Sequence, residues 1–271
     1  MAFDRDLVPE ILRDAATRVI LPRWRALDAD QVHAKERPDD LVTIADTEAE
    51  ELITAALLRL APGVPVIGEE AVAADPSLLD GLPGLSAYWL VDPIDGTSNF
   101  VEGTADFGVM VAYVEGGEVA ASWIWLPVAG VLASAERGGG ARIDGRLVDV
   151  AAEPVRPIAD LRGWAATKFM PAEVRESLRP EAAEVLSVPP PQSAAIGYTR
   201  LLEGMADVSL FWRSYPWDHA PGSLMLEESG GAVRRLDGTA YRPGTTDYGL
   251  LAVHDERTWA DLRALVLPAE V

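Results

Sequence analysis

Between residues 108 and 150 the chain repeats a short apolar segment followed by a tight turn. The turns contain glycine, as in Glu115-Gly116-Gly117-Glu118 and Asp144-Gly145, and such turns typically join the strands of a β-hairpin. Because strands joined by tight turns pair in antiparallel fashion, this stretch predicts an antiparallel sheet. Its apolar segments are residues 109–114, 119–126, 131–135 and 141–150.

The chain on either side of this stretch has helical character. Apolar residues at helical spacing predict a helix within residues 6–28, which Pro22 would kink or end, and a helix from Thr47 to Leu60 with Asp46 as its N-cap. A short strand is expected at residues 64–67. After Pro154, strand and helix patterns alternate. The strands are expected at residues 162–167, 208–212 and 249–254, and the helices at 172–178, 193–206, 218–229 and 258–267.

The change of pattern near residue 150 predicts a domain boundary. Residues 1–150 would form an N-terminal α+β domain that binds metal, and residues 151–271 a C-terminal α/β domain that completes the substrate site. A chain of 271 residues is long enough for an ample buried core, whether it forms one large domain or two modest ones.

Composition excludes several classes of site and partner. The chain has no cysteine, which rules out disulfides and thiolate metal sites, and its three scattered histidines disfavour a zinc site. A formal net charge of −20 argues against nucleic-acid binding. We find no signal-peptide pattern and no apolar run approaching the ~18 residues of a membrane span. We therefore expect a cytoplasmic protein without a membrane partner, and any metal to be held by oxygen atoms.

The most informative motif begins where the apolar run Tyr88–Val91 ends. Asp92 and Asp95 follow it three residues apart, and Gly96 and Thr97 come directly after. Divalent cations such as Mg²⁺ prefer carboxylate oxygens together with substrate phosphate. Gly96 permits close backbone approach, and a helix starting at Thr97 would offer amide groups to an anion. This motif indicates phosphate-ester chemistry, although Asp-Pro and Asp-Gly pairs also occur in ordinary turns.

Four charged residues elsewhere stand at positions typical of a site. Glu69 follows a predicted strand, Asp46 lies where a strand-like segment meets a helix, Asp218 opens a predicted helix, and Lys35 precedes Asp40-Leu41-Val42-Thr43. Each has an ordinary alternative: helix N-caps for the two aspartates, and solvated surface charges for Glu69 and Lys35. Packed into one pocket, acidic side chains at residues 46, 69, 92, 95 and 218 would repel one another, and bound metal would relieve that repulsion.

Together these motifs resemble those of the inositol monophosphatase family, which comprises Mg²⁺-dependent, lithium-sensitive phosphatases. The resemblance extends along nearly the whole chain and rests on Gly68-Glu69-Glu70, Asp92-Pro93-Ile94-Asp95-Gly96-Thr97, and Trp217-Asp218 followed by Gly222. It implies a layered α-β-α-β-α sandwich, hydrolysis of a small phosphate monoester such as inositol monophosphate, and a homodimer.

The resemblance also implies a role for each site residue. Two or three Mg²⁺ ions would be bound, the first by Glu69, Asp92 and the carbonyl of Ile94, the second by Asp92, Asp95 and Asp218, and a weaker third by Glu69 with water. Thr97 and Asp46 would orient the attacking water, with Glu69 as a further catalytic residue. Lys35 would lie on a mobile loop near the metals. The substrate would contact Asp95, Gly96, Thr97, Ser193, Ala194, Arg213 and Asp218.

Substrate choice is where the sequence departs from the family pattern. Animal members carry a glutamate that contacts the inositol ring seven residues before the last metal aspartate, and Phe211 stands there in this chain. Arg213 would meet a second anionic group or be a surface residue, and His219 would touch substrate or simply pack at a helix start. Histidinol phosphate, nucleotide bisphosphates and fructose bisphosphate remain alternative substrates. A non-catalytic regulator that binds metal or phosphate is the alternative outside enzymes.

Overall fold

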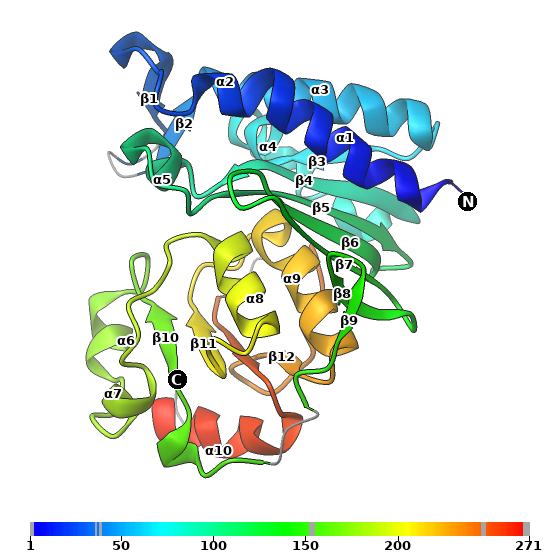
Figure 1. Ribbon diagram of the computed structural model, residues 1–271. Helices are drawn as coiled ribbons and strands as arrows, with labels where there is room; N and C mark the ends of the chain where they lie inside the picture. Colours follow the sequence, from blue (N-terminus) through cyan, green and yellow to red (C-terminus); the bar gives the residue numbers. More distant parts are fainter. Residues whose placement is uncertain (1–2, 36, 38–39, 152–154, 245–247, 268–271) are drawn as a thin grey trace.

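The computed structural model describes residues 3–35, 37, 40–151, 155–244 and 248–267. Helices and sheets alternate in five layers (Figure 1). Helices α1 and α3 cover one face of a seven-stranded sheet, α8 and α9 fill the space between this sheet and a four-stranded sheet, and α10 packs on the far side of the small sheet. This arrangement confirms the layered sandwich that the sequence predicts.

The large sheet has the strand order β3-β4-β5-β6-β7-β8-β9. Every neighbouring pair in it is antiparallel except β3 and β4, which are parallel. The antiparallel sheet predicted for residues 108–150 is therefore confirmed. Its strands are β3 Val66–Gly68, β4 Ala87–Asp95, β5 Gly108–Glu115, β6 Glu118–Leu126, β7 Val131–Glu136, β8 Gly140–Ile143 and β9 Arg146–Val148.

The first helical layer begins with α1 (Val8–Ala15), which continues through a π-helical turn at Ala16–Ile20 into α2 (Leu21–Arg23). The helical path ends one residue after Pro22, as the sequence predicts. Helix α3 runs from Ile44 to Leu60. Buried residues of these helices pack on the large sheet, among them Leu12, Ile20, Ile53 and Leu57 against Trp89 and Val111.

The N-cap predicted for α3 was wrong. Thr43, not Asp46, caps the helix, because Thr43 has an extended backbone and its Oγ1 accepts a hydrogen bond from the amide of Ala45 at 3.1 Å. Asp46 is the third helical residue, and its Oδ2 accepts hydrogen bonds from the amide and hydroxyl of Thr43 at 2.8 and 2.6 Å. This reciprocal pair is a capping box.

The small sheet has the order β10-β11-β13-β12. Strands β10 and β11 are parallel, and the other two pairs are antiparallel. Strand β2 matches the strand-like segment expected before Asp46. Strands β1 and β12 and helices α4 and α7 were not predicted, because segments of three to six residues carry little periodicity. The remaining elements are β1 Val32–Ala34, β2 Leu41–Thr43, α4 Glu69–Ala74, α5 Thr97–Glu102, β10 Gly163–Ala166, α6 Ala172–Glu176, α7 Ala182–Val185, α8 Ala194–Leu202, β11 Val208–Phe211, α9 Pro216–Glu228, β12 Ala232–Arg235, β13 Leu250–Val253 and α10 Glu256–Val266.

Helix α9 is buried around most of its circumference, because a sheet lies on either side of it. It begins at Pro216, so Asp218 is its third residue. The sequence pattern had predicted that Asp218 would be the first. Gly222 lets α9 approach α8 closely: a Cβ atom at this position would lie 2.0 Å from the ring of Tyr198. This contact packs α9 closely against α8 in the layer between the two sheets. No helix in the described part of the chain is long and apolar enough to cross a membrane.

Candidate active site

A β-bulge at the end of β4 turns two carboxylates toward the same side of the sheet. In a regular strand, residues three apart point to opposite faces. Here Asp92 pairs with Met110 and Asp95 with Gly108, so three steps along β4 match two steps along β5. The extra residue reverses the alternation, and Pro93 suits the irregular stretch because it has no amide hydrogen to donate. Asp92 and Asp95 are both buried.

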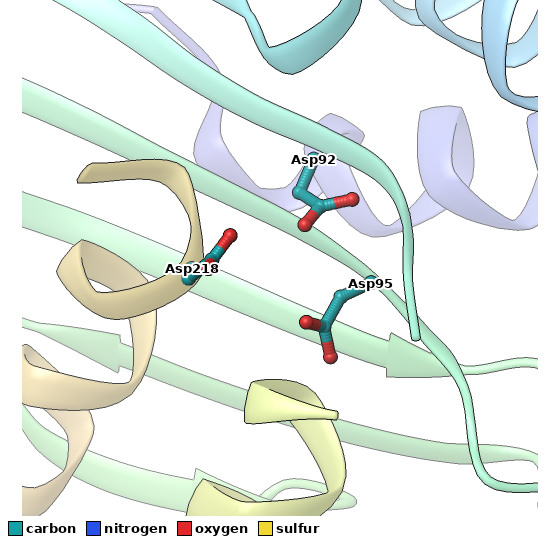
Figure 2. A group of neighbouring side chains, drawn as sticks. All are labelled: Asp92, Asp95 and Asp218. Carbon is teal, nitrogen blue, oxygen red and sulfur yellow. The ribbon is translucent and has the colours of Figure 1, made fainter. Parts of the chain in front are cut away.

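The start of α9 brings Asp218 to the same place. One carboxylate oxygen from each of Asp92, Asp95 and Asp218 lies within 4.8 Å of the other two. Figure 2 shows the three side chains directed toward a common space, two from the β4 segment and one from α9. Residues more than 120 positions apart in the sequence are thus brought together, as the metal-site prediction requires.

The three carboxyl groups are electrostatically unfavourable without a counterion. Burial raises the pKa of Asp92 well above its usual range, and the negative charges of Glu69, Asp95 and Asp218 raise it further. Burial likewise raises the pKa values of Asp95 and Asp218. A divalent cation would offset both the desolvation and the mutual repulsion. The donor set consists of oxygen atoms alone, which fits a hard cation such as Mg²⁺.

Asp95 is held in place by the start of α8. Its two carboxylate oxygens accept hydrogen bonds from the hydroxyl of Ser193 and from the amides of Ala194 and Ala195, the amide bonds measuring 3.1 and 2.7 Å. These donors favour the ionised carboxylate and oppose the effect of burial on its pKa. Ser193 and Ala194 were predicted to contact substrate. They line the cavity at this site, and in addition they orient Asp95.

Thr97 and Asp46 form a pair beside the carboxylate group. The Oγ1 of Thr97 lies 3.1 Å from Oδ1 of Asp46 and 3.1 Å from the carbonyl oxygen of Ile94. Burial raises the pKa of Asp46 to about 6, although hydrogen bonds from Thr43 and Thr97 oppose the shift. The hydroxyl of Thr97 thus lies within reach of two acceptors, and either of them can take its hydrogen. Gly96, directly before it, has a φ of +90°, a conformation that glycine adopts readily.

Glu69 lies at the first position of α4 and is paired with a lysine. The Nζ of Lys35 is 2.8 Å from Oε1 of Glu69 and 2.8 Å from Oε1 of Glu70. The three-carboxylate group defined above does not include Glu69, although its charge raises the pKa of Asp92. The role of Glu69 as a metal ligand stays a prediction.

Glu50, which no sequence motif singled out, fixes the start of α4. Its buried carboxylate accepts hydrogen bonds from the amides of Glu70 and Ala71 at 2.8 and 2.9 Å. Gly68 makes room for this contact, since a Cβ atom there would lie 2.2 Å from the carboxyl carbon of Glu50. One signal was present in the sequence. Glu50 follows Asp46 by four residues and so lies on the same face of α3.

Most of the groups described above line one cavity of about 530 Å³ between the two sheets. Asp46 and Lys35 are not part of its lining and lie behind Thr97 and Glu69, to which they are hydrogen-bonded. The predicted site residues that do line the cavity are Glu69, Asp92, Ile94, Asp95, Gly96, Thr97, Ser193, Ala194, Arg213 and Asp218, together with Phe211 and His219.

His219 is packed, as one of the two interpretations of the sequence has it. Only 2% of its surface is exposed, Nδ1 lies 3.1 Å from the hydroxyl of Tyr198, and Nε2 lies 2.9 Å from the carbonyl oxygen of Arg213. Burial lowers the pKa of His219 to about 3, so its ring is uncharged at neutral pH. His219 thus links the start of α9 to the segment that carries Arg213.

Comparison with known proteins agrees with this architecture. The model of the inositol monophosphatase family matches residues 7–267. The chain belongs to this family. The fructose-1,6-bisphosphatase/inositol-1-monophosphatase of Thermotoga maritima is 30% identical over 228 residues, which cover 81% of this chain and 80% of that protein. The inositol-1-monophosphatase of Mesorhizobium japonicum is 34% identical over 208 residues, 74% of each chain.

A solved structure shares the fold of this chain along nearly its whole length. The extragenic suppressor protein suhB from Bartonella henselae aligns with this chain at a TM-score of 0.82 and 24% identity, covering 98% of both chains. The resemblance seen in the three sequence motifs is therefore confirmed at the level of family and fold.

Proposed function

We propose that the protein is a Mg²⁺-dependent phosphatase that hydrolyses a small phosphate monoester. The observation that carries the proposal is the convergence of three carboxylates, those of the buried Asp92 and Asp95 and of the half-buried Asp218, on the wall of a cavity large enough for a small substrate. Membership of the inositol monophosphatase family supports it.

Two or three Mg²⁺ ions would be held by Asp92, Asp95 and Asp218, with the carbonyl of Ile94 and the carboxylate of Glu69 completing the set. When bound, such ions lower the pKa of water and neutralise charge on the phosphoryl oxygens. Lys35 is bonded to Oε1 of Glu69, so Oε2 of the same carboxylate would serve as the ligand. Lys35 also contacts Glu70.

The chain's own groups supply orientation. Thr97 donates its hydroxyl hydrogen to Asp46 or to the carbonyl of Ile94, so the oxygen of Thr97 is left to accept a hydrogen bond from the attacking water. That hydrogen bond directs a water lone pair toward phosphorus. The backbone amides of Gly96 and Thr97 would hold phosphate oxygens beside Asp95. Positioning of this kind supplies much of the catalysis in phosphoryl transfer.

Inositol monophosphate is the first substrate to test, because the name of the Mesorhizobium relative includes it. Fructose 1,6-bisphosphate is the second, because the name of the Thermotoga relative includes both. Phe211 cannot hydrogen-bond a hydroxyl as the glutamate expected at this position would. We also propose that the protein is a cytoplasmic homodimer and that lithium inhibits it.

The test is phosphate release with Mg²⁺, with and without Li⁺, from inositol, fructose, histidinol and nucleotide phosphates. The wild type, Asp92→Asn and a surface control, Asp14→Asn, are compared. We expect Mg²⁺-dependent turnover that Asp92→Asn abolishes without unfolding the protein and that the control retains. Near-wild-type turnover in Asp92→Asn would reject the metal scheme. Tight metal binding without turnover on any monoester would favour a non-catalytic regulator.

A further inference from the structure

Basic side chains surround one aromatic ring on the side of the cavity that the small sheet forms. The guanidinium carbon of Arg213 lies 3.9 Å from the ring centroid of Phe169, and Nζ of Lys168 and the guanidinium carbon of Arg37 lie 5.2 and 5.3 Å from the same centroid. Phe169, Lys168 and Arg213 line the same cavity as the three aspartates. We call these three residues the basic wall.

The fold places the basic wall where layered α/β proteins bind ligands. Strands β10 and β11 are parallel, and Ala166 pairs with Phe211 at their carboxyl ends. The chain leaving β10 carries Lys168 and Phe169, and the chain leaving β11 carries Arg213, so the two segments emerge side by side. The carboxyl edge of parallel strands is the usual place for a ligand in such sheets.

Arg213 is held in position before any ligand arrives. Its guanidinium lies close to two rings, that of Phe169 and that of Tyr215, whose centroid is 4.7 Å away. Its NH1 is 3.5 Å from Oδ2 of Asp40, and its carbonyl oxygen is 2.9 Å from Nε2 of His219. A contact of 3.5 Å is long for a charged hydrogen bond, and a guanidinium has five N–H donors. The contact with Asp40 therefore uses only a small part of the hydrogen-bonding capacity of Arg213.

The positive charge of the basic wall suits it to binding an anion. Burial opposes the charge of Arg213, but the carboxylates of Asp218 and Asp40 outweigh it and raise the pKa of Arg213, so the side chain stays charged. In a chain of net charge −20, a cavity that gathers cations on one wall offers anions a local attraction that opposes the repulsion from the overall charge. The aspartate group and its metals would take the scissile phosphate, which leaves the basic wall for a different negative group.

We propose that Arg213, supported by Phe169 and Lys168, forms a subsite for a second anionic group of the substrate. The favoured substrate is then a phosphate monoester that carries another phosphate or a carboxylate, and not the phosphate of a neutral polyol. This inference rests on the proposed phosphatase function. Planar, bidentate recognition by arginine suits either anion.

The experiment compares two matched substrate pairs. Fructose 1-phosphate and fructose 1,6-bisphosphate differ by a second phosphate, and glycerol 3-phosphate and 3-phosphoglycerate differ by a carboxylate. For the wild type we expect kcat/KM to be roughly ten-fold or more higher for the doubly anionic member of at least one pair, the size expected for charged hydrogen bonds. The pair that shows the preference identifies the second anion as phosphate or carboxylate.

Three variants assign the preference to the subsite. Arg213→Gln is expected to lower it by roughly ten-fold, the effect of losing a charged hydrogen bond. Lys168→Gln is expected to lower it by less, and because Lys168 is exposed this substitution changes the charge of the wall without altering the buried core. Arg18→Gln breaks an exposed Arg–Asp pair that is not part of the cavity lining and is expected to leave the preference unchanged.

Failure of the subsite and failure of the proposed function give different results. Phosphate release without preference in either pair, or an unchanged preference in Arg213→Gln and Lys168→Gln, overturns the subsite alone. If no phosphate is released from any compound, the phosphatase proposal fails. Calorimetric dissociation constants for the same pairs then decide the subsite: tighter binding of the doubly anionic member, lost in the variants, supports it, and equal binding overturns it.

Discussion

Single residues at this site act through the groups they hold. Asp95 receives its orientation from Ser193 and two amides of α8, and Thr97 from Asp46 and the carbonyl of Ile94. The sequence predicted which of these residues matter because acidic side chains at a strand end carry a clear chemical signal. It did not predict the contacts of Ser193 with Asp95, because the two lie 98 residues apart and nothing local links them.

Thr97→Ala tests the division of labour at the residue scale. The variant loses the hydroxyl that orients water but keeps every carboxylate, so we expect turnover to fall roughly hundred-fold while Mg²⁺ affinity stays close to wild type. Thr97→Ser keeps the hydroxyl and is expected to recover most of the turnover. The measurements are kcat and calorimetric Mg²⁺ binding. An equal loss of turnover and metal affinity in Thr97→Ala would contradict the role assigned to the hydroxyl.

At the scale of elements, the site depends on short segments whose position is set by longer ones. The bulge in β4 decides where Asp92 and Asp95 point, and α4, only six residues long, carries Glu69. Long, strongly patterned elements such as α3 and the hairpin β5–β6 were predictable from periodicity. The bulge, α4 and β12 were not, because pairing across the sheet and packing between layers determine them and not the local sequence.

Glu50→Gln tests how α3 positions α4. The change removes the negative charge of the carboxylate that accepts hydrogen bonds from the amides of Glu70 and Ala71. We therefore expect α4 to shift and Mg²⁺ affinity to fall roughly ten-fold, as is usual when a group that orients a metal ligand is altered. Glu51→Gln on the exposed side of α3 is the matched control. Calorimetric Mg²⁺ titrations of both variants measure the difference. Wild-type affinity in Glu50→Gln would show that Glu50 has no part in positioning Glu69.

At the scale of the whole molecule, the cavity lies where two sheets and the helices between them meet. Four of the five acidic residues that the sequence singled out line it, and the fifth, Asp46, supports Thr97 from behind. Their convergence is a property of the five-layer fold, which the family resemblance implied and local patterns did not. The division into two domains at residue 150 stays a prediction, since α9 packs against both sheets.

The stability of the whole protein should depend on pH in a way that metal reverses. Burial raises the pKa of Asp92, Asp95 and Asp218 above their values in the unfolded chain, and that of Asp46 to about 6. The folded state therefore binds more protons than the unfolded state, and this contribution to stability is lost as pH rises through the folded pKa values. We expect the metal-free protein to melt at a lower temperature at pH 8 than at pH 6.

Mg²⁺ stabilises the ionised carboxylates and is expected to remove most of this difference, because it binds the folded state. Asp92→Asn should show a smaller pH dependence without metal and a smaller response to Mg²⁺. Melting curves at both pH values, with and without Mg²⁺, provide the measurement. A metal-free protein that is more stable at pH 8, or a full Mg²⁺ response in Asp92→Asn, would disagree with the electrostatic account.

The most direct measurement is anomalous X-ray diffraction from crystals soaked with Mn²⁺ in place of Mg²⁺. We expect an anomalous peak between the carboxylates of Asp92, Asp95 and Asp218, and its loss in crystals of Asp92→Asn. A soaked crystal with no peak among these three side chains would contradict the claim that they form a metal centre.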